Sequence, residues 1–150
     1  GGAYDDRTAG RSGANTLAGG SGSDTVTGGA GSDVLIGGTG ADKLYGGTDS
    51  VRDVFDFDRV SDSRGSGSDD VYQFRSGTDD FDLRTIDANS ALAGNQAFVW
   101  GGTKAVAHGV WVADTGADLR VFADVNGDKV ADFSFDVMGV STVVASDFML

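Results

Sequence analysis

Residues 19–45 read GGSGSDTVT GGAGSDVLI GGTGADKLY, which are three consecutive units of nine residues. Each unit fits the pattern G-G-x-G-x-D-x-U-x, in which U is an apolar residue. Self-similarity at a fixed short period is typical of repeat architectures, so this stretch decides the fold. The flanks keep only part of the pattern: Asn15 takes the Asp position of unit 10–18, and Asp53 follows Gly46-Gly47 two residues late. The array therefore predicts three full repeats with decayed ends that act as caps.

Each position of the unit has a physical role. Glycine reaches φ > 0 in tight turns without steric cost and leaves backbone carbonyl oxygens accessible. Calcium takes about 6–8 hard oxygen ligands, so one turn with several carbonyls and one carboxylate supplies roughly half of a shell. Two stacked turns would complete it. The final x-U-x triplet suits a short strand whose U side chain points inward, at Leu17, Val26, Leu35 and Leu44.

The units resemble the nonapeptide array of RTX exoproteins. The resemblance implies a parallel β-roll with two units per coil and calcium ions between same-side turns of adjacent coils. It places Asp6, Asp24 and Asp42 along one edge of the roll. Asn15 and Asp33 lie along the other edge, with Asp53 as a displaced continuation. The candidate metal ligands are Gly19, Gly20, Gly22, Asp24, Gly28, Gly29, Gly31, Asp33, Gly37, Gly38, Gly40, Asp42, Asn15 and Asp53.

Some of these sites are better supported than others. The strongest site lies between turns 19–24 and 37–42, with the carboxylates of Asp24 and Asp42. A second site uses Asp33 with either the 10–15 turn or the 46–53 segment. Tyr4 stands where the pattern has Gly, which weakens a site at Asp6.

The charge balance agrees with a bound cation. The chain carries 23 acidic and 11 basic residues, for a net charge of −12. This excludes nucleic acid as a partner, because phosphate binding needs a basic face, and it disfavours anionic lipid. Clustered carboxylates repel one another until a cation neutralises them. We therefore expect residues 1–55 to be largely disordered without calcium and to fold when it binds.

The second half of the chain predicts further strands. Residues 51–60 alternate apolar and charged side chains and read as a strand leaving the roll, whereas 61–70 read as a polar loop. Strands are also expected at 95–100, 109–113, 118–125 and 131–137. Asn126-Gly127 favours a hairpin between the last two. The alternative is an EF-hand-like loop of Asp124, Asn126, Asp128 and Asp132, but Phe135 stands where that loop needs Glu, and metal binding here is left open.

Two segments of this half resemble serralysin-type C-terminal domains. Residues 78–89, TDDFDLRTIDAN, are similar to the segment that follows the roll in those proteins. Their carboxylates either bind another ion or form a solvated strand face; they are Asp79, Asp80, Asp82 and Asp87. The ending Asp147-Phe148-Met149-Leu150 resembles the terminal secretion signal read by a type I (ABC) exporter. The alternative for this ending is a last strand tucked into the core.

The motifs of catalysis are missing from this chain. A zincin needs two histidines in H-E-x-x-H, and His108 is the one histidine present. The chain is therefore expected to be non-catalytic. The resemblance to serralysin-type proteins implies an N-terminal catalytic domain, such as a metalloprotease, in the parent protein. No apolar run reaches 18 residues, so no membrane span is expected. Trp100, Trp111, Tyr72 and Phe98 either form a sugar-binding platform or belong to the core.

The sequence thus predicts an all-β protein: a parallel calcium β-roll (RTX) at 1–55 and a β-sandwich-like C-terminal cap at 56–150 that carries the secretion signal. The resemblance implies a secreted, extracellular module that drives calcium-dependent folding and type I secretion of an exoprotein. One alternative is a polysaccharide-binding module, like the R-modules of alginate epimerases. Its basic candidates are Arg7, Arg11, Lys43, Arg52, Arg59 and Arg64. The other alternative is a calcium-dependent adhesive or surface-layer module.

Overall fold

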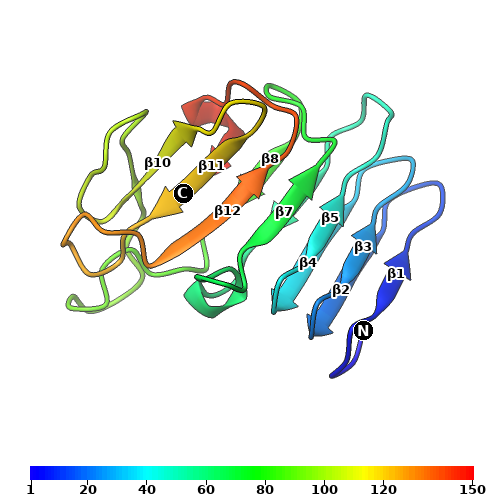
Figure 1. The fold of residues 1–150 in the computed structure, drawn as a ribbon, viewed down its shortest axis with the longest axis horizontal. Helices are drawn as coiled ribbons and strands as arrows, with labels where there is room; N and C mark the ends of the chain where they lie inside the picture. The colour runs from blue at the N-terminus through cyan, green and yellow to red at the C-terminus, as the bar shows by residue number, and fades with distance from the viewer.

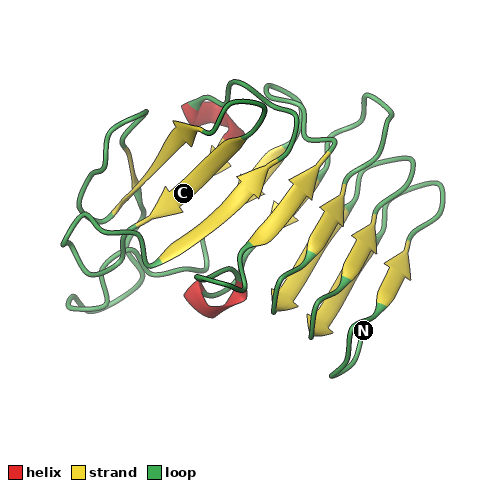
Figure 2. Cartoon of the chain, in the orientation of Figure 1, coloured by secondary structure: helices red, strands yellow, loops and turns green.

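The computed structural model describes residues 1–150 as thirteen strands in two sheets, with two short 3-10 segments, η1 (Val60–Asp62) and η2 (Ala145–Asp147), and no α-helix (Figures 1 and 2). The first sheet has the strand order β1 (Arg7–Ala9), β3 (Thr25–Thr27), β5 (Lys43–Tyr45), β7 (Asp69–Tyr72), β12 (Phe133–Val137), β11 (Leu119–Ala123), β10 (Gly109–Asp114) and β9 (Val99–Trp100). The second has the order β13 (Phe148–Met149), β8 (Asp80–Asp82), β6 (Val54–Asp56), β4 (Val34–Thr39) and β2 (Thr16–Ser21). The predicted all-β class is confirmed.

The chain winds between the two sheets as a parallel roll. Strands β1, β3, β5 and β7 enter the first sheet in turn, and β2, β4, β6 and β8 enter the second. Neighbours within each sheet are parallel, and Thr25 pairs with Lys43 just as Leu17 pairs with Leu35, so one coil holds two nine-residue units. Figure 1 shows these coils stacked side by side from the N-terminal end. The predicted β-roll is confirmed. The division at residue 55 stays a prediction, while the parallel winding itself runs on through β8.

The core lies between the two sheets. Alternate residues of a strand face opposite sides, so the U position of each unit points inward. Val26, Leu35 and Leu44 are fully buried there, as predicted, while Leu17 in the first coil packs against the core and stays half-buried. The later coils replace these aliphatic residues with Phe55 and other aromatic side chains, which stack and tilt against one another. Roll and cap therefore share one continuous apolar cluster.

The cap extends the first sheet with an antiparallel meander of β10, β11 and β12, and β12 joins the roll by parallel pairing with β7. The predicted hairpin between β11 and β12 is confirmed, but the connection spans 124–132 rather than a two-residue turn at Asn126-Gly127. The loop expected at 61–70 is also shorter, because Asp69 and Asp70 already belong to β7. No helix of this fold has the length and apolar character that crossing a bilayer requires.

Candidate metal centre

A ladder of carboxylates runs along one edge of the roll. The backbone N–H of Asp6 donates to Oδ1 of Asp24 at 2.7 Å, and the N–H of Asp24 donates to Oδ1 of Asp42 at 2.7 Å. The N–H of Asp42 donates in turn to Oδ1 of Asp69 at 2.9 Å. Each aspartate therefore binds the backbone of its counterpart one coil earlier, which sets the turns of successive coils directly above one another.

A second ladder runs along the opposite edge. The N–H of Asn15 donates to Oδ1 of Asp33 at 2.9 Å, and the N–H of Asp33 donates to Oδ1 of Asp53 at 2.9 Å. The N–H of Asp53 then donates to Oδ1 of Asp79 at 3.0 Å. The two edges predicted from the repeat are thus present, with Asp53 in its expected place, and each edge gains one further aspartate.

The second carboxylate oxygen has no hydrogen-bond partner in four of the ladder aspartates. Oδ2 is buried without any hydrogen bond in Asp24, Asp33, Asp42 and Asp69. Burying an unpaired charged oxygen is unfavourable unless a counter-charge accompanies it. Oxygens at the N-terminal ends of the ladders are satisfied by their own turns, because Gly2 N–H donates to Oδ2 of Asp6 and Arg11 N–H donates to Oδ1 of Asn15. The oxygens that lack a partner, and that a cation would satisfy, therefore lie in the coils after the first.

Glycine makes room for these oxygens. A Cβ at Gly19 or Gly37 would lie 2.5 Å from Oδ2 of Asp24 or Asp42, respectively, closer than real Cβ atoms approach. Gly38 has φ +100°, and a Cβ there would lie 2.0 Å from the carbonyl oxygen of Gly20 in the coil before it. Only glycine lets carbonyl and carboxylate oxygens crowd together in this way. Gly19, Gly20, Gly37 and Gly38 lie near the ends of strands β2 and β4. The other candidate glycines lie in the turns that follow the strands, at positions 22, 28, 29, 31 and 40.

Burial and mutual repulsion set the protonation of the ladders. Burial, together with the charge of neighbouring carboxylates, raises the pKa of Asp42 and of Asp53 to about 6 and that of Asp69 to about 9, against the lowering effect of the backbone N–H bonds. Burial also raises the pKa of Asp33. A cation between the coils would remove this penalty and allow the carboxylates to be ionised.

The donor set fits a hard divalent cation. No group of three or more His, Cys, Asp or Glu side chains gathers anywhere, because each turn contributes a single carboxylate. Zinc and other softer metals prefer such clusters of side chains, whereas calcium accepts mixed carbonyl and carboxylate oxygens. The sequence predicted that Asp24 lies next to Asp42 and that Asp33 has Asp53 as a possible partner. The structure stacks both pairs, each joined by a hydrogen bond between successive coils.

Asp69 and Asp79 extend the ladders beyond the repeats. Sequence reasoning treated Asp69 as part of a polar loop and Asp79 as one member of an acidic segment. A signal was present, since Asp69-Asp70-Val71 and Asp79-Asp80-Phe81 repeat the Asp-x-apolar step of the nine-residue unit. The other carboxylates of 79–87 do not join the ladder: Asp80 pairs with Arg52, Asp82 pairs with Arg84, and Asp87 accepts the N–H groups of Asn89 and Gln96.

The loop 124–132 is closed by its own hydrogen bonds. The buried carboxylate of Asp124 accepts the backbone N–H groups of Asn126, Gly127, Lys129 and His108. Burial acts to raise the pKa of Asp124, but these four donors outweigh it and hold the pKa below its usual value. Asp132 and Asp128 likewise accept N–H groups within the loop. Asp124 therefore organises the β11–β12 connection through backbone hydrogen bonds.

His108 and the candidate aromatic platform have structural roles. Nδ1 of His108 lies 2.8 Å from the carbonyl oxygen of Ala88, and no hydroxyl group hydrogen-bonds to the ring. Phe98 is buried in the core, and Trp100 packs on Phe148 with ring centroids 5.0 Å apart. Trp111 instead stacks on Phe122. The four predicted aromatic side chains thus form no single surface.

The C-terminal segment is docked in the folded protein. Ser76 Oγ donates to Oδ2 of Asp147 at 2.6 Å, and the N–H of Gly77 donates to Oδ1 at 2.8 Å. Phe148 is buried against Phe81, and β13 pairs in parallel with β8. Met149 and Leu150 are half-buried. The last strand is therefore part of the core.

Comparison with known proteins places this architecture. The family model described as "Peptidase M10 serralysin C terminal" matches residues 6–150. The chain belongs to the serralysin C-terminal family. The resemblance drawn from the repeats is confirmed. Membership of this family supports a calcium-binding β-roll module that is separate from the catalytic domain of a parent protein. A search among curated proteins found no match.

Solved structures similar to this serralysin C-terminal domain come from an Azotobacter vinelandii enzyme, a mannuronan C5-epimerase. Its AlgE6R3 subunit superposes with a TM-score of 0.72 at 27% identity, covering 97% of this chain and 78% of that one. The AlgE6R2 subunit gives a TM-score of 0.67 at 22% identity, covering 99% and 89%, and shows the fold alone.

Proposed function

We propose that this domain is a calcium-dependent folding module that accompanies an exoprotein through type I secretion and orders it outside the cell. The observation that carries the proposal is the pair of aspartate ladders in which Asp24, Asp33, Asp42 and Asp69 each bury a carboxylate oxygen without a hydrogen-bond partner. Along the first edge, Asp24, Asp42 and Asp69 would hold calcium with the glycine turns between them. Along the second edge, Asp33 and Asp53 would do so, whereas Asp79 already accepts the N–H of Arg75 and pairs with its guanidinium. When bound, calcium supplies the positive charge that these buried carboxylates otherwise lack.

The ladders make folding cooperative. Each inner aspartate binds the backbone of one coil through Oδ1 and directs Oδ2 toward the glycine turn of its own coil. One coil therefore cannot order without its neighbour. Without a counter-charge, the like charges of successive carboxylates oppose this stacking, and the first coils contribute few large apolar groups to offset chain entropy. Residues 1–55 are the part that depends most on calcium.

The docked C-terminus links folding to export. An exporter that reads Asp147–Leu150 must meet the chain before folding, because Phe148 is buried and Asp147 is fully enclosed in the folded state. Extracellular calcium modules operate at about 10⁻⁴–10⁻³ M, far above the range of cytosolic sensors. A chain that folds only at such concentrations stays unfolded inside the cell, where the exporter can bind its C-terminal residues. Outside the cell it folds and buries Asp147 and Phe148. The parent exoprotein and its secreted location follow from this proposal.

Export of a passenger tests the proposal. The passenger, without a signal of its own, is fused ahead of the domain in cells that carry a type I exporter. The wild type is expected in the medium, protease-resistant with calcium and protease-sensitive with a chelator. Deletion of Asp147–Leu150 should keep the fusion inside, whereas Gly-Ser replacement of the exposed residues 90–93 should leave export unchanged. Equal export of the deletion variant would overturn the role in secretion.

A further inference from the structure

The second edge of the roll ends in a turn that keeps the form of the repeat but has arginine in place of a glycine. Residues 74–82 read FRSGTDDFD and retain the glycine, the aspartate and the apolar residue of the fourth, sixth and eighth positions of the unit. Gly77 has φ +79°, in the left-handed region where the fourth-position glycines of the array also lie, and Phe81 is fully buried as the inward residue. The segment is therefore a further unit of the roll, with Arg75 at its second position.

The turns of the roll occur in an open and a closed form. In the open form, the second residue is a glycine with a left-handed φ, such as +113° at Gly29, and the ladder aspartate of that turn buries an oxygen without a partner, such as Oδ2 of Asp33. In the closed form, the second residue has a φ outside this region and donates its N–H to the side chain four residues later. The open form thus leaves an aspartate oxygen for a cation, whereas the closed form satisfies it within the turn.

Arginine at the second position keeps a turn in the closed form. Arg75 N–H donates to Oδ2 of Asp79 at 2.8 Å, and Arg11 N–H, which also precedes Ser-Gly, donates to Oδ1 of Asn15 at 2.8 Å. Gly2 closes the first turn in the same way, so glycine is compatible with both forms. A residue with a Cβ strongly disfavours the φ of the open form. The last turn of the second edge is therefore closed because of its sequence.

The Arg75 side chain brings a positive charge to the gap between two successive turns. Its Nε lies 3.8 Å from Oδ2 of Asp79, which is buried, and its Nη2 donates to the carbonyl oxygen of Val51 at 3.4 Å. Val51 belongs to the 46–53 segment of the preceding coil. A carbonyl oxygen from one turn and a carboxylate from the next are ligands of the kind that calcium takes. In this gap both oxygens face the guanidinium instead.

We propose that Arg75 is a built-in counter-ion that ends the second edge in place of a calcium ion. The proposal rests on the proposed calcium function and deepens it, because it states which gap between turns takes no metal. The last coil of the second edge then needs no ion of its own. The first edge ends differently, since Asp69 keeps a buried oxygen without a partner. The turn closed by Arg75 also donates two hydrogen bonds to Asp147, so the C-terminal segment docks on a turn without metal.

The number of calcium ions bound by the full chain tests this assignment, measured by equilibrium dialysis and elemental analysis. Arg75→Gly restores the glycine of the repeat and removes the counter-charge, so the number should rise by about one ion per chain. Arg75→Gly/Asp79→Asn should return it to the wild-type value, because the carboxylate ligand is lost. Asp79→Asn alone should leave the wild-type number unchanged. Lys104→Gly is the control, because it removes one exposed positive charge and adds one glycine in the cap.

Circular dichroism in calcium on the same samples reports whether each variant folds. An unchanged number of ions in folded Arg75→Gly overturns the assignment, and so does an equal gain in Lys104→Gly, since net charge alone would then explain it. Loss of an ion in Asp79→Asn alone also overturns it, because calcium would then already bind at this turn in the wild type. This single variant decides the question if Arg75→Gly does not fold. A wild type that binds no calcium contradicts the proposed function instead.

Discussion

Asp69→Asn is the most informative single substitution in the ladders. Asp69 is fully buried, its Oδ1 accepts the N–H of Asp42 at 2.9 Å, and its Oδ2 has no partner. Asparagine has nearly the same shape and keeps an oxygen for the Asp42 N–H, but it removes the charge. The change should therefore stabilise the calcium-free fold and destabilise the calcium-bound one. The sign of the change in the free energy of unfolding thus depends on whether calcium is bound.

The magnitudes follow from burial and linkage. Relief of a buried unsatisfied acceptor is worth about 1–3 kcal/mol. The pKa of about 9 limits the destabilisation of the calcium-free fold by the Asp69 carboxylate to about 5 kcal/mol at about pH 7.5, at 1.36 kcal/mol per pH unit. In calcium, loss of one carboxylate ligand that weakens a site about tenfold costs about 1.4 kcal/mol, which lowers Tm by about 3–6 °C for a chain of this size.

The assay is thermal and isothermal far-UV circular dichroism, with saturating calcium and with chelator. Asp70→Asn is the matched control, because Asp70 lies next on β7 but faces away from the ladder toward Lys43 and Tyr72. We expect Asp69→Asn to show more strand signal than the wild type in chelator and a lower Tm in calcium. A loss of stability of equal size in both conditions, or the same pattern in Asp70→Asn, would refute the reasoning.

Three further predictions follow. The pKa values of Asp42 and Asp53 are raised to about 6. These two groups therefore contribute to the stability of the calcium-free fold below about pH 4, and that contribution is lost as the pH rises through about 6. The strand signal in chelator should grow when the pH falls from about 7.5 to about 5, while the affinity for calcium drops. Asp124→Asn removes one of the two carboxylate oxygens that accept four backbone N–H groups, so some of these donors lose their acceptor. Chemical denaturation should show a loss of about 1–3 kcal/mol in the free energy of unfolding that is equal with and without calcium. A loss that depends on calcium would indicate a metal site in that loop. Ser76→Ala removes the hydroxyl bond to Asp147, so carboxypeptidase should trim the C-terminus faster than in the exposed control Ser66→Ala, and equal rates would mean that this bond does not hold β13.

The fold of the repeats was predictable because its signal is local. A nine-residue period with one apolar residue per unit specifies which side chain points inward, and Val26, Leu35 and Leu44 are all fully buried. Two units per coil then bring Asp24 next to Asp42, a separation of 18 residues. The spacing alone contains the first fact, whereas the two-unit coil was what the resemblance to RTX arrays implied.

The continuation of the ladders was not predictable in the same way. Asp42 reaches Asp69 over 27 residues and Asp53 reaches Asp79 over 26, because loops of unequal length enter the later coils. The Asp-x-apolar step survives there, but without a period it cannot be placed in register. In the cap, the hairpin could be predicted from Asn126-Gly127, but the length of its loop could not. That length depends on the backbone N–H groups that donate to the Asp124 carboxylate.

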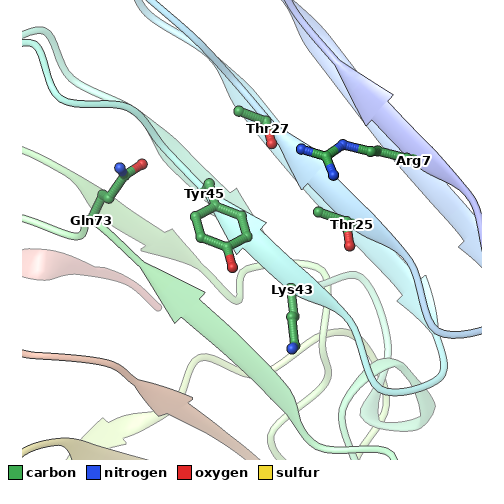
Figure 3. A pocket seen from close by; sticks show the side chains of 6 residues that line it. All are labelled: Arg7, Thr25, Thr27, Lys43, Tyr45 and Gln73. Atoms are coloured by element: carbon green, nitrogen blue, oxygen red, sulfur yellow. The ribbon is translucent and has the colours of Figure 1, made fainter.

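The tertiary grouping of aromatic and basic residues also lay beyond the sequence. Phe98 and Trp100 belong to the core because the C-terminal strand returns to the sheet and places Phe148 against Trp100. Arg7 and Lys43 line one hollow (Figure 3) because they stand two coils apart on the same face, with Thr25 between them. Both groupings depend on which strands become neighbours.

Calcium titration followed by far-UV circular dichroism tests the central claim most directly. It compares the wild type with Asp24→Asn/Asp42→Asn and with the charge-matched control Asp114→Asn/Asp128→Asn, whose two aspartates are exposed. We predict that strand signal appears cooperatively with calcium, that the ladder variant shifts the midpoint to higher calcium, and that the control does not. A wild type that is fully folded in chelator and unchanged by calcium would contradict the account.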